Sequence, residues 1–387
     1  MNESFLSPLS SQFQVQYRYS VQFTKGIFDL KNPSLRDFLT SEKKDGDTKK
    51  ALVVLDQGLI FHYPNLVSEI KDYFKGLTSI IQLTGDIMVI PGGEECKNDP
   101  QLWDSLVNAV DLYGIDRHSY IIAIGGGAIL DLVGYVAAVS HRGIRLIRIP
   151  TTVLSQNDSG VGVKNSINYQ GKKNFLGTFA PPIAVFNDIL FLESLDVRDW
   201  RSGMAEAIKV SLIKDKDFFL WIESHALSLK NRDLEAMAYL VHRCAELHME
   251  HIANGDPFEF GSSRPLDFGH WAAHKLEYLT KFSIRHGEAV AIGMALDTVY
   301  SFQKHFLSKA EMDRILDLLK NLGFDIFHIK LKENEKQNLY SGLQEFREHL
   351  GGKLTIMLLA GIGIPREVHE IDEKSLANSV DYLEQVV

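Results

Sequence analysis

Hydrophobic and polar positions change their spacing about halfway along the chain. In the first half, short apolar runs rich in β-branched residues alternate with stretches of helical period. These runs predict strands at residues 51–55, 87–90, 120–124, 146–149 and 183–186. Buried strands separated by helices are typical of parallel β–α–β units. The first half therefore predicts an α/β domain built on a parallel sheet.

The second half follows helical periodicity almost throughout, with apolar residues recurring at intervals of three and four. This pattern predicts helices at residues 202–213, 234–251, 267–279, 288–306 and 309–322, and a charged, solvated connection at 330–336. A chain of 387 residues is long for a single core. We predict an N-terminal α/β nucleotide-binding domain over residues 1–190 and an all-α C-terminal domain over 191–387, with a site in the cleft between them.

Composition and charge narrow the classes of partner. The net charge of −9 argues against broad binding to nucleic acids or anionic membranes. Cys96 and Cys244 lie far apart without metal-type spacing, so a reducing cytoplasm fits better than a disulfide framework. The first residues do not have the order of a secretory signal, and no apolar run approaches the roughly 18 residues of a membrane span. We expect a cytoplasmic protein with no membrane or nucleic-acid partner.

A glycine-rich turn directly follows the predicted strand at 120–124. Gly126 and Gly127 would let the backbone approach a pyrophosphate at a helix N-terminus. The spacing differs from the G-x-G-x-x-G fingerprint, so an ordinary loop is the alternative. Asp56 ends the first strand, where a carboxylate could bind ribose hydroxyls or merely open a turn. Glu94 and Lys97 are equally consistent with a site or with a solvated surface pair.

The segment from residue 150 to 177 is dense in small polar groups and poor in apolar ones. Long polar segments inside compact domains are more often functional than structural. Lys164, Lys173 and Asn174 could bind a phosphate through charge-assisted hydrogen bonds. A polar surface loop is the alternative interpretation.

The segment from residue 263 to 288 indicates a metal site. Asp267, His270 and His274 are spaced by three and four, which on a helix places them on one face. His286 follows in the context Arg-His-Gly-Glu. Two imidazoles need only one upstream carboxylate to hold a divalent metal. For each histidine alone, an ordinary structural role is the alternative.

Glu206 is the candidate for that carboxylate. Its apolar neighbours predict a largely buried helix, in which an unpaired glutamate would be costly. A role as metal ligand would offset this cost. A surface ion pair with Lys209, three residues on, is the alternative.

Several blocks together resemble the sugar phosphate cyclases of the dehydroquinate synthase superfamily. The resemblance extends from about residue 56 to 364 and includes GGGAILDLVGYVAA, RGIRLIRIPTTVLSQNDSGVGVKNSIN, GKKNFLG, GMAEAIK, LDFGHWAAH and RHGEAVAIGM, in the family's order. It implies a two-domain, NAD-dependent enzyme with zinc or cobalt. It also implies a carbon–oxygen lyase acting on a sugar phosphate, usually as a homodimer.

The resemblance assigns roles position by position. It implies metal ligands at Glu206, His270 and His286. It implies NAD contacts at Asp56, Glu94, Lys97, Gly126, Gly127, Asp131, Thr151, Thr152 and Lys173. It implies catalytic or substrate-pocket positions at Asp158, Lys164, Asn174, Lys209, Asp267 and His274, with Arg264 close to an arginine of the family and Arg142 reaching the neighbouring subunit's pocket.

The family chemistry explains these residue types. A ring hydroxyl of a seven-carbon sugar phosphate is oxidised by tightly held NAD⁺, and phosphate is then eliminated. The ketone is reduced again, the ring opens, and an aldol step closes a carbocycle. The metal polarises the hydroxyl and the resulting carbonyl. Lys209 and Asp158 would orient hydroxyls and relay protons, and Lys164, Asn174 and His274 would bind the phosphate with the partner's Arg142.

Departures from the dehydroquinate synthase pattern bear on the substrate. Ser263 stands at the position of the family's arginine, with Arg264 one residue away, and Asp267 replaces an asparagine. Lysines of the family are absent near Met249 and in residues 347–349. Fewer cations and a new carboxylate disfavour a carboxylated substrate. The leading candidate is sedoheptulose 7-phosphate, the substrate of the valiolone-forming synthases.

Three alternatives remain open at this stage. The first is 3-dehydroquinate synthase acting on 3-deoxy-arabino-heptulosonate 7-phosphate, favoured by His274, which keeps that enzyme's residue type. The second is a metal-dependent polyol or glycerol dehydrogenase, which shares the glycine-rich turn but has no need of the phosphate-type cluster at Lys164, Lys173 and Asn174. The third is a binding protein without catalysis, which the intact set of metal-ligand residues disfavours.

Overall fold

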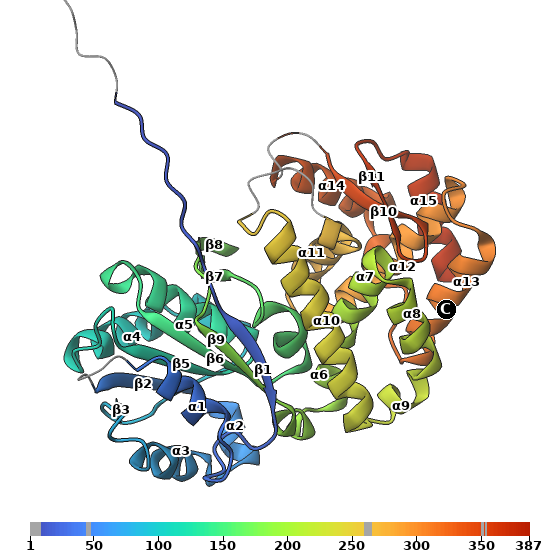
Figure 1. Ribbon diagram of the computed structural model, residues 1–387. Helices are drawn as coiled ribbons and strands as arrows, with labels where there is room; N and C mark the ends of the chain where they lie inside the picture. Colours follow the sequence, from blue (N-terminus) through green and yellow to red (C-terminus); the bar gives the residue numbers. More distant parts are fainter. Residues whose placement is uncertain (1–8, 44–47, 259–264, 350–351, 353) are drawn as a thin grey trace, which may run out of the picture.

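A parallel sheet forms the centre of the first half of the molecule (Figure 1). The computed structural model describes residues 9–43, 48–258, 265–349, 352 and 354–387. Seven strands run in the order β1–β9–β6–β5–β2–β3, with β4 also paired to β2, and every pairing is parallel. The strands are β1 (Ser20–Thr24), β2 (Lys49–Asp56), β3 (Ile81–Leu83), β4 (Met88–Ile90), β5 (Tyr120–Gly125), β6 (Arg145–Pro150) and β9 (Ala184–Asp188). The predicted parallel sheet is confirmed, and β1 and β3 add to it.

Helices cover both faces of this sheet because successive side chains of each strand point to opposite sides. Along β2, Ala51, Val53 and Leu55 pack in one apolar cluster, whereas Leu52 and Val54 pack in another. The first cluster includes residues of α1 (Ser34–Ser41), α2 (Gln57–His62) and α3 (Leu66–Lys75). The second includes residues of α4 (Pro100–Leu112) and α5 (Gly127–Val139).

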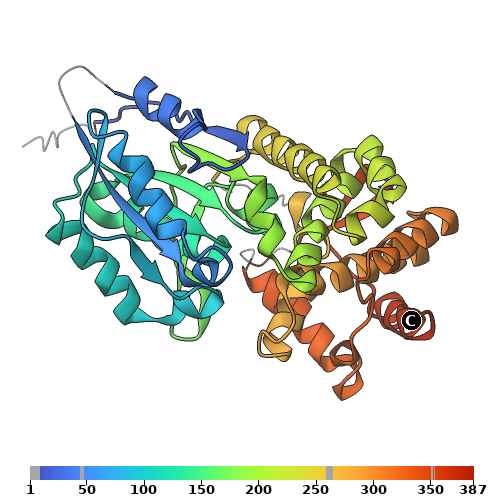
Figure 2. The same cartoon turned by 90° about the horizontal axis from the view of Figure 1, so that it is seen from below.

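The second half is helical, as predicted, and lies beside the sheet half (Figure 2). Its helices are α6 (Val197–Ser202), α7 (Met204–Lys214), α8 (Lys216–Ser224), α9 (Ala226–Lys230), α10 (Leu234–Asn254), α11 (His270–Leu279), α12 (His286–Gln303), α13 (Lys309–Asn321), α14 (Gln337–His349) and α15 (Glu373–Gln385). A hairpin of β10 (Ile356–Gly361) and β11 (Ile364–Val368), which the periodicity did not predict, completes it. The domain boundary after residue 190 stays a prediction.

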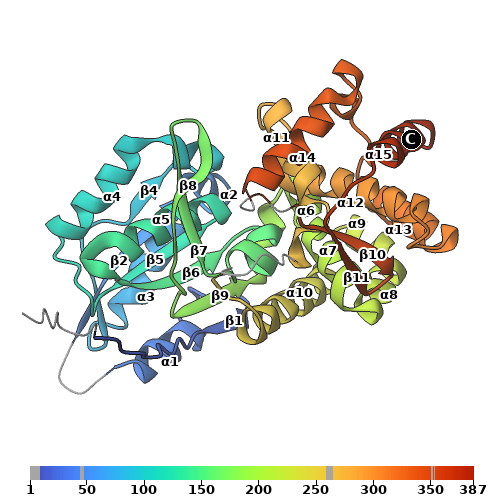
Figure 3. The same ribbon diagram turned by 90° about the horizontal axis from the view of Figure 1, so that it is seen from above.

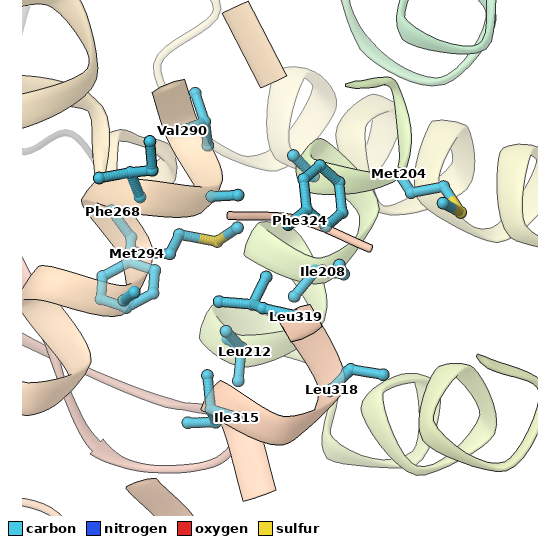
Figure 4. Packing of buried hydrophobic residues seen from close by; sticks show 14 of the residues in the cluster. Met204, Ile208, Leu212, Phe268, Val290, Met294, Ile315, Leu318, Leu319 and Phe324 are labelled. Carbon is cyan, nitrogen blue, oxygen red and sulfur yellow. The ribbon is translucent and has the colours of Figure 1, made fainter. Parts of the chain in front are cut away.

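One large apolar core holds these helices together. Figure 4 shows Ile208 and Leu212 of α7 beside Met294 of α12 and Leu319 of α13. Every residue of α7 from Met204 to Ile213 is buried. The predicted burial of this helix is therefore confirmed, and the two charged side chains that it carries into the core, Glu206 and Lys209, need a compensating interaction.

Two segments near the predicted site differ from the sequence-based expectation. The helix predicted from residue 267 begins only at His270, because Gly269 adopts the left-handed conformation with φ +77°. Asp267 lies in a short 3₁₀ turn before it, so the prediction of one shared helix face was wrong for Asp267. The segment 330–336 contains two short 3₁₀ turns, and its Leu331 is buried rather than solvated.

The polar segment after residue 150 folds into a turn and a hairpin. A π-helical turn covers Ser155–Ser159, and the antiparallel strands β7 (Lys164–Tyr169) and β8 (Lys172–Phe179) follow. In Figures 1 and 3 the hairpin lies beside α5, on the side of the sheet half that faces the helices. Within the described residues, no helix has the length and apolar character needed to span a membrane.

Candidate active site

Three side chains from three helices converge on one point in the helical half. Glu206 comes from α7, His270 from the first turn of α11 and His286 from the first turn of α12. Glu206 Oε1 lies 3.6 Å from His270 Nε2 and 3.5 Å from His286 Nε2. One ligand atom from each of the three residues lies within 4.8 Å of the others. The structure thus brings together the three residues predicted to bind a metal.

Both histidine rings present the nitrogen that a metal requires. His270 Nδ1 lies 3.2 Å from the carbonyl oxygen of Phe268, and His286 Nδ1 lies 3.3 Å from Glu277 Oε2. A carbonyl or carboxylate oxygen only accepts, so Nδ1 of each ring donates its hydrogen. Each Nε2 then faces Glu206 Oε1 and, once it carries no hydrogen, is the nitrogen that can bind a metal.

Glu206 is a buried carboxylate, 1% exposed, that is paired with the ammonium of Lys209 and faced by Nε2 of both histidines. Burial alone would raise its pKa, but the ion pair with Lys209 and the proximity of His286 outweigh burial and lower the pKa to about 2. A buried carboxylate faced by two imidazole nitrogens is the environment that a bound cation would complete. Glutamate with two imidazoles suits zinc, and also cobalt. The residues therefore fit a divalent metal.

Lys209 and Asp158 line a small cavity, about 10 Å³, next to this cluster. Burial would lower the pKa of Lys209, but the charges of Glu206 and Asp158 raise it. Burial would raise the pKa of Asp158, but His248 above all lowers it. His248 Nδ1 lies 2.8 Å from Asp158 Oδ1. The two predicted proton-handling residues thus lie together beside the three predicted metal ligands, and both are charged.

Asp267 and His274 also belong to this neighbourhood. The charge of Asp267 is among those that raise the pKa of Lys209, and the preceding residue, Leu266, lines the small cavity with Glu206 and Lys209. The ring of His274 lies 5.6 Å from that of His270 and 6.3 Å from that of His286, between ring centroids. The site therefore combines an imidazole and a carboxylate around the predicted metal position.

The predicted nucleotide residues gather at the carboxyl ends of the sheet strands. The chain leaves β2 toward β3 and β4 on one side and returns to β5 on the other, so the strand order reverses between β2 and β5. Ligands of parallel α/β sheets bind at such a switch point. Asp56 ends β2, and its carboxylate accepts a hydrogen bond of 2.9 Å from the backbone nitrogen of Gly58. Gly126 and Gly127 open α5 beside it, where the helix N-terminus favours an anion.

The Asp56 carboxylate lies close enough to this glycine turn for the turn to affect its pKa. Burial raises its pKa, and the backbone N–H groups of Gly58 and Gly126 partly oppose this effect. Thr151 continues the same edge, with its backbone nitrogen 3.1 Å from the carbonyl oxygen of Gly125. Thr152 follows and hydrogen-bonds Ser155 through its hydroxyl at 2.8 Å. This edge has the acidic residue, the tight turn and the helix end that a dinucleotide requires.

Lys97 connects several of the predicted residues. Its ammonium is buried, lies 2.6 Å from Asp131 Oδ2 and donates to the side-chain oxygen of Asn174. Glu94 Oε1 lies 3.8 Å from the same ammonium. The surface-pair alternative for Glu94 and Lys97 is thereby excluded, because Lys97 is only 4% exposed.

The remaining predicted residues lie farther out. Lys164 opens β7 with an exposed side chain, and Lys173 forms an ion pair with Glu277 at 3.0 Å. Arg142 adopts a positive φ of 64° and lines a separate cavity of about 340 Å³ beside α5 and β8, which contains none of the metal ligands. Arg264 lies outside the described residues.

Sequence reasoning missed three residues that support the site. His248 on α10 faces Asp158, Glu277 on α11 contacts His286, and Asp297 on α12 accepts hydrogen bonds of 2.9 Å from Gly269 N and Trp271 Nε1. His248 and Glu277 lie within predicted helices, and nothing in the local pattern links them to Asp158 or His286. Asp297 carried only the weak signal of a charged residue within a predicted apolar helix.

Comparison with known proteins agrees with this geometry. Two family models match, 3-dehydroquinate synthase N-terminal over residues 87–202 and 3-dehydroquinate synthase C-terminal over residues 203–345. A 3-dehydroquinate synthase of Syntrophotalea carbinolica is 37% identical over 311 residues, covering 79% of this chain and 83% of that protein. A 2-epi-5-epi-valiolone synthase of Streptomyces albus is 31% identical over 375 residues, covering 95% and 88%.

The fold of this chain also matches that of a solved structure. The 2-epi-5-epi-valiolone synthase of Streptomyces hygroscopicus subsp. jinggangensis, determined with NAD⁺ and Zn²⁺ bound, is 28% identical. It superimposes with a TM-score of 0.86 over 98% of this chain and 100% of that one. On these matches and on the converging site residues, the chain belongs to the 3-dehydroquinate synthase superfamily, as its sequence blocks predicted.

Proposed function

We propose that this protein is an NAD- and divalent-metal-dependent sugar phosphate cyclase, a carbon–oxygen lyase, that converts sedoheptulose 7-phosphate to a valiolone-type cyclitol. The observation that carries the substrate choice is Asp267, which follows a residue that lines the small cavity beside Glu206 and Lys209. The similarity to valiolone synthases over almost the whole chain supports the same choice.

Glu206, His270 and His286 would hold the metal, zinc or cobalt, and the edge formed by Asp56, Gly126 and Gly127 would hold NAD. When bound, NAD⁺ supplies a hydride acceptor, and the metal supplies a Lewis acid for the hydroxyl being oxidised. The protein's own contribution is to orient the sugar between the two groups and to keep the bound protons at defined atoms.

Lys209 and Asp158 would handle protons at the ring hydroxyls. Lys209 is a buried, charged donor beside Glu206, and Asp158 is an ionised acceptor supported by His248. A donor and an acceptor on one cavity wall can bind adjacent hydroxyls in a single orientation. In this arrangement His248 keeps Asp158 in place and ready to accept a proton.

The phosphate would bind between the two halves of the molecule. The Asn174 side-chain oxygen accepts from Lys97 and from Ser166 Oγ, at 2.9 Å for the latter, so its NH₂ group is left to donate to a phosphate oxygen. Lys164 and His274 would add charge and a further donor. Arg142 would reach the phosphate of a second protomer, because it lies away from the metal ligands of its own chain. We therefore propose a homodimer with shared sites.

Two other activities have specific support. The 3-dehydroquinate synthase reaction is favoured by the 37% identical relative and by His274. It would require the carboxylate of its substrate to bind near Asp267, and repulsion between the two anions disfavours this arrangement. A polyol or glycerol dehydrogenase would use the same metal and nucleotide residues, but it gives no role to Lys164 and Asn174.

A single assay separates these functions. Zinc- or cobalt-loaded protein is incubated with NAD⁺ and either sedoheptulose 7-phosphate or 3-deoxy-arabino-heptulosonate 7-phosphate, and inorganic phosphate and NADH are measured. We expect phosphate release from sedoheptulose 7-phosphate without net NADH, since one nucleotide serves both redox steps. Stoichiometric NADH without phosphate would identify a dehydrogenase. Turnover of the heptulosonate alone would identify a 3-dehydroquinate synthase.

A further inference from the structure

Glu277 is a buried carboxylate that contacts a metal ligand without being one. It lies on α11 and is 4% exposed. Its Oε2 lies 3.3 Å from His286 Nδ1, and its Oε1 lies 3.0 Å from Lys173 Nζ. Each carboxylate oxygen thus has its own partner, and the three residues come from β8, α11 and α12.

The contact with His286 determines which nitrogen faces the site. Because Glu277 Oε2 accepts from Nδ1–H, the ring is held with Nε2 toward Glu206 Oε1, at 3.5 Å. A ring bonded at Nδ1 cannot rotate freely, so Nε2 is the nitrogen that it offers to a metal. Carboxylates in this position orient metal-binding histidines and increase their basicity.

Lys173 completes the arrangement from the other half of the molecule. Without it, Glu277 Oε1 would be a buried anionic oxygen deprived of its charge partner. Lys173 belongs to the β7–β8 hairpin of the sheet half, whereas Glu277 and His286 belong to the helical half. The next residue, Asn174, contacts Lys97 of the nucleotide cluster. The hairpin therefore reaches both clusters through adjacent residues.

We propose that Glu277 is a positioning residue for the metal ligand His286, and that Lys173 fixes Glu277 across the two halves of the protein. The proposal rests on the metal site put forward above, but not on the identity of the sugar. Lys173 was predicted from the family resemblance as an NAD contact. Its ion pair with Glu277 gives it a second role on the side of the metal.

The test measures metal binding directly. Metal-free full-length protein is titrated with Zn²⁺ against a chromophoric chelator, and with Co²⁺ while its visible absorption spectrum is recorded. We expect Glu277→Gln to weaken Zn²⁺ binding about 10- to 100-fold and to alter the Co²⁺ spectrum, as carboxylates behind histidine ligands typically do. Lys173→Met should shift affinity in the same direction by a smaller factor, and Lys173→Arg should restore it.

A matched control exists on the same helix. Lys275 of α11 is also buried, but it pairs with Glu345 of α14 at 2.6 Å. Lys275→Met removes a buried lysine of α11 without touching His286, so Zn²⁺ affinity should stay within about twofold of the original protein. If Glu277→Gln does not fold, as judged by circular dichroism, Lys173→Met tests the same ion pair by removing the partner of Glu277.

The outcomes distinguish this proposal from the proposed function. Original Zn²⁺ affinity and an unchanged Co²⁺ spectrum in both Glu277→Gln and Lys173→Met would overturn the positioning role. Failure of the unsubstituted protein to bind Zn²⁺ or Co²⁺ would overturn the metal site and this proposal together. Metal binding that depends on Glu277, without turnover of either sugar phosphate, would overturn only the proposed function.

Discussion

His286 combines two features that make metal binding dependent on pH. In the metal-free protein, burial alone would lower its pKa, but Glu206 and Glu277 raise it to about 9 from an ordinary value of 6.5. The pKa of His270, by contrast, is held well below its ordinary value, mainly by burial. At neutral pH a metal must therefore displace one proton from His286 and none from His270.

We expect the apparent Zn²⁺ affinity to increase about tenfold per pH unit between pH 7 and 9 and then to level off. The raised pKa also stabilises the metal-free fold below about pH 6.5, a contribution that is lost as the pH rises through about 9. Zn²⁺ competition titrations across this range, and thermal unfolding of the metal-free protein, measure the two effects. A pH-independent affinity would contradict the assigned protonation state.

Asp267 gives the second prediction at the residue scale. Asp267→Asn removes the negative charge near Lys209 and should relax the exclusion of a carboxylated substrate. We expect the ratio of kcat/KM for the heptulosonate phosphate to that for sedoheptulose 7-phosphate to rise at least about tenfold, or about 1.4 kcal/mol.

The matched control is Asp313→Asn on α13, where Asp313 pairs with Lys309 at the surface. This variant removes the same charge away from the site and should leave the ratio of kcat/KM values unchanged. Equal ratios in Asp267→Asn and in the unsubstituted protein would remove Asp267 from substrate selection.

Site residues could be identified from the sequence where a residue type suited to metal binding also stood at an unusual position or spacing. Glu206 was identifiable because a charged residue stood inside an apolar helix, and His270 and His286 because two imidazoles lay close along the chain. The contact between His248 and Asp158 joins residues 90 positions apart, and it depends on how α10 packs against the turn at Ser155–Ser159. Local periodicity contains no information on such a contact.

At the scale of elements, the close approach of α11 and α12 determines the distance between the two histidine ligands. A Cβ added at Gly293 of α12 would lie 1.9 Å from the carbonyl oxygen of Gly269, the residue before α11. The two backbones therefore touch where His270 begins its helix. Asp297, one turn further along α12, binds the same turn through Gly269 N.

Gly293→Ala should separate these helices. We expect it to lower the free energy of unfolding by about 2–3 kcal/mol and to weaken Zn²⁺ binding, because the clash is with backbone and cannot be relieved by a rotamer change. Denaturant unfolding and metal titration measure the two effects.

Gly342→Ala on α14 is the control for this substitution. Its added Cβ would meet only side-chain atoms of Lys275, the nearest at 3.0 Å. These neighbours need to give way by only a few tenths of an ångström, so the free energy of unfolding should change by less than about 1 kcal/mol. A Gly293→Ala protein as stable and as metal-competent as this control would show that the helix contact is not required.

Element types were predictable from periodicity, whereas their ends were not. The helix predicted at 267–279 begins three residues later, at His270. Gly269 packs against Met294 in the left-handed conformation, and a helix cannot continue through such a residue whatever the apolar pattern. The hairpin of β10 and β11 was not predicted, although Gly361, Gly363 and Pro365 make a helix unfavourable in this segment.

At the scale of the whole molecule, the placement of Arg142 predicts that two chains complete one site. A chain with Arg142→Ala keeps its metal ligands, and a chain with His270→Ala keeps the arginine. Each homodimer alone should be nearly inactive. Random mixing makes half of the dimers mixed, and each mixed dimer holds one intact site, so about a quarter of the full activity should return.

The measurement is phosphate release before and after unfolding and refolding the two variants together. Mixing without refolding serves as the control for slow subunit exchange. Activity that stays at the level of the separate variants, or an Arg142→Ala homodimer with full activity, would place the arginine outside the site. Only the family resemblance could suggest such a shared site. The residue pattern of a single chain does not indicate which of its residues contact a second chain.

The pairing of β1 with β9 has a consequence for how the protein is made. Ser20 of β1 pairs with Ala184 of β9, so the two paired strands are separated by some 160 residues of sequence. During synthesis on the ribosome, β1 remains without its neighbour until most of the sheet half has emerged. Such distant pairing slows folding and leaves a strand edge exposed meanwhile. We therefore expect the yield of soluble protein to rise when translation is slowed at low temperature. This gain comes from the folding process and does not depend on how stable the folded protein is.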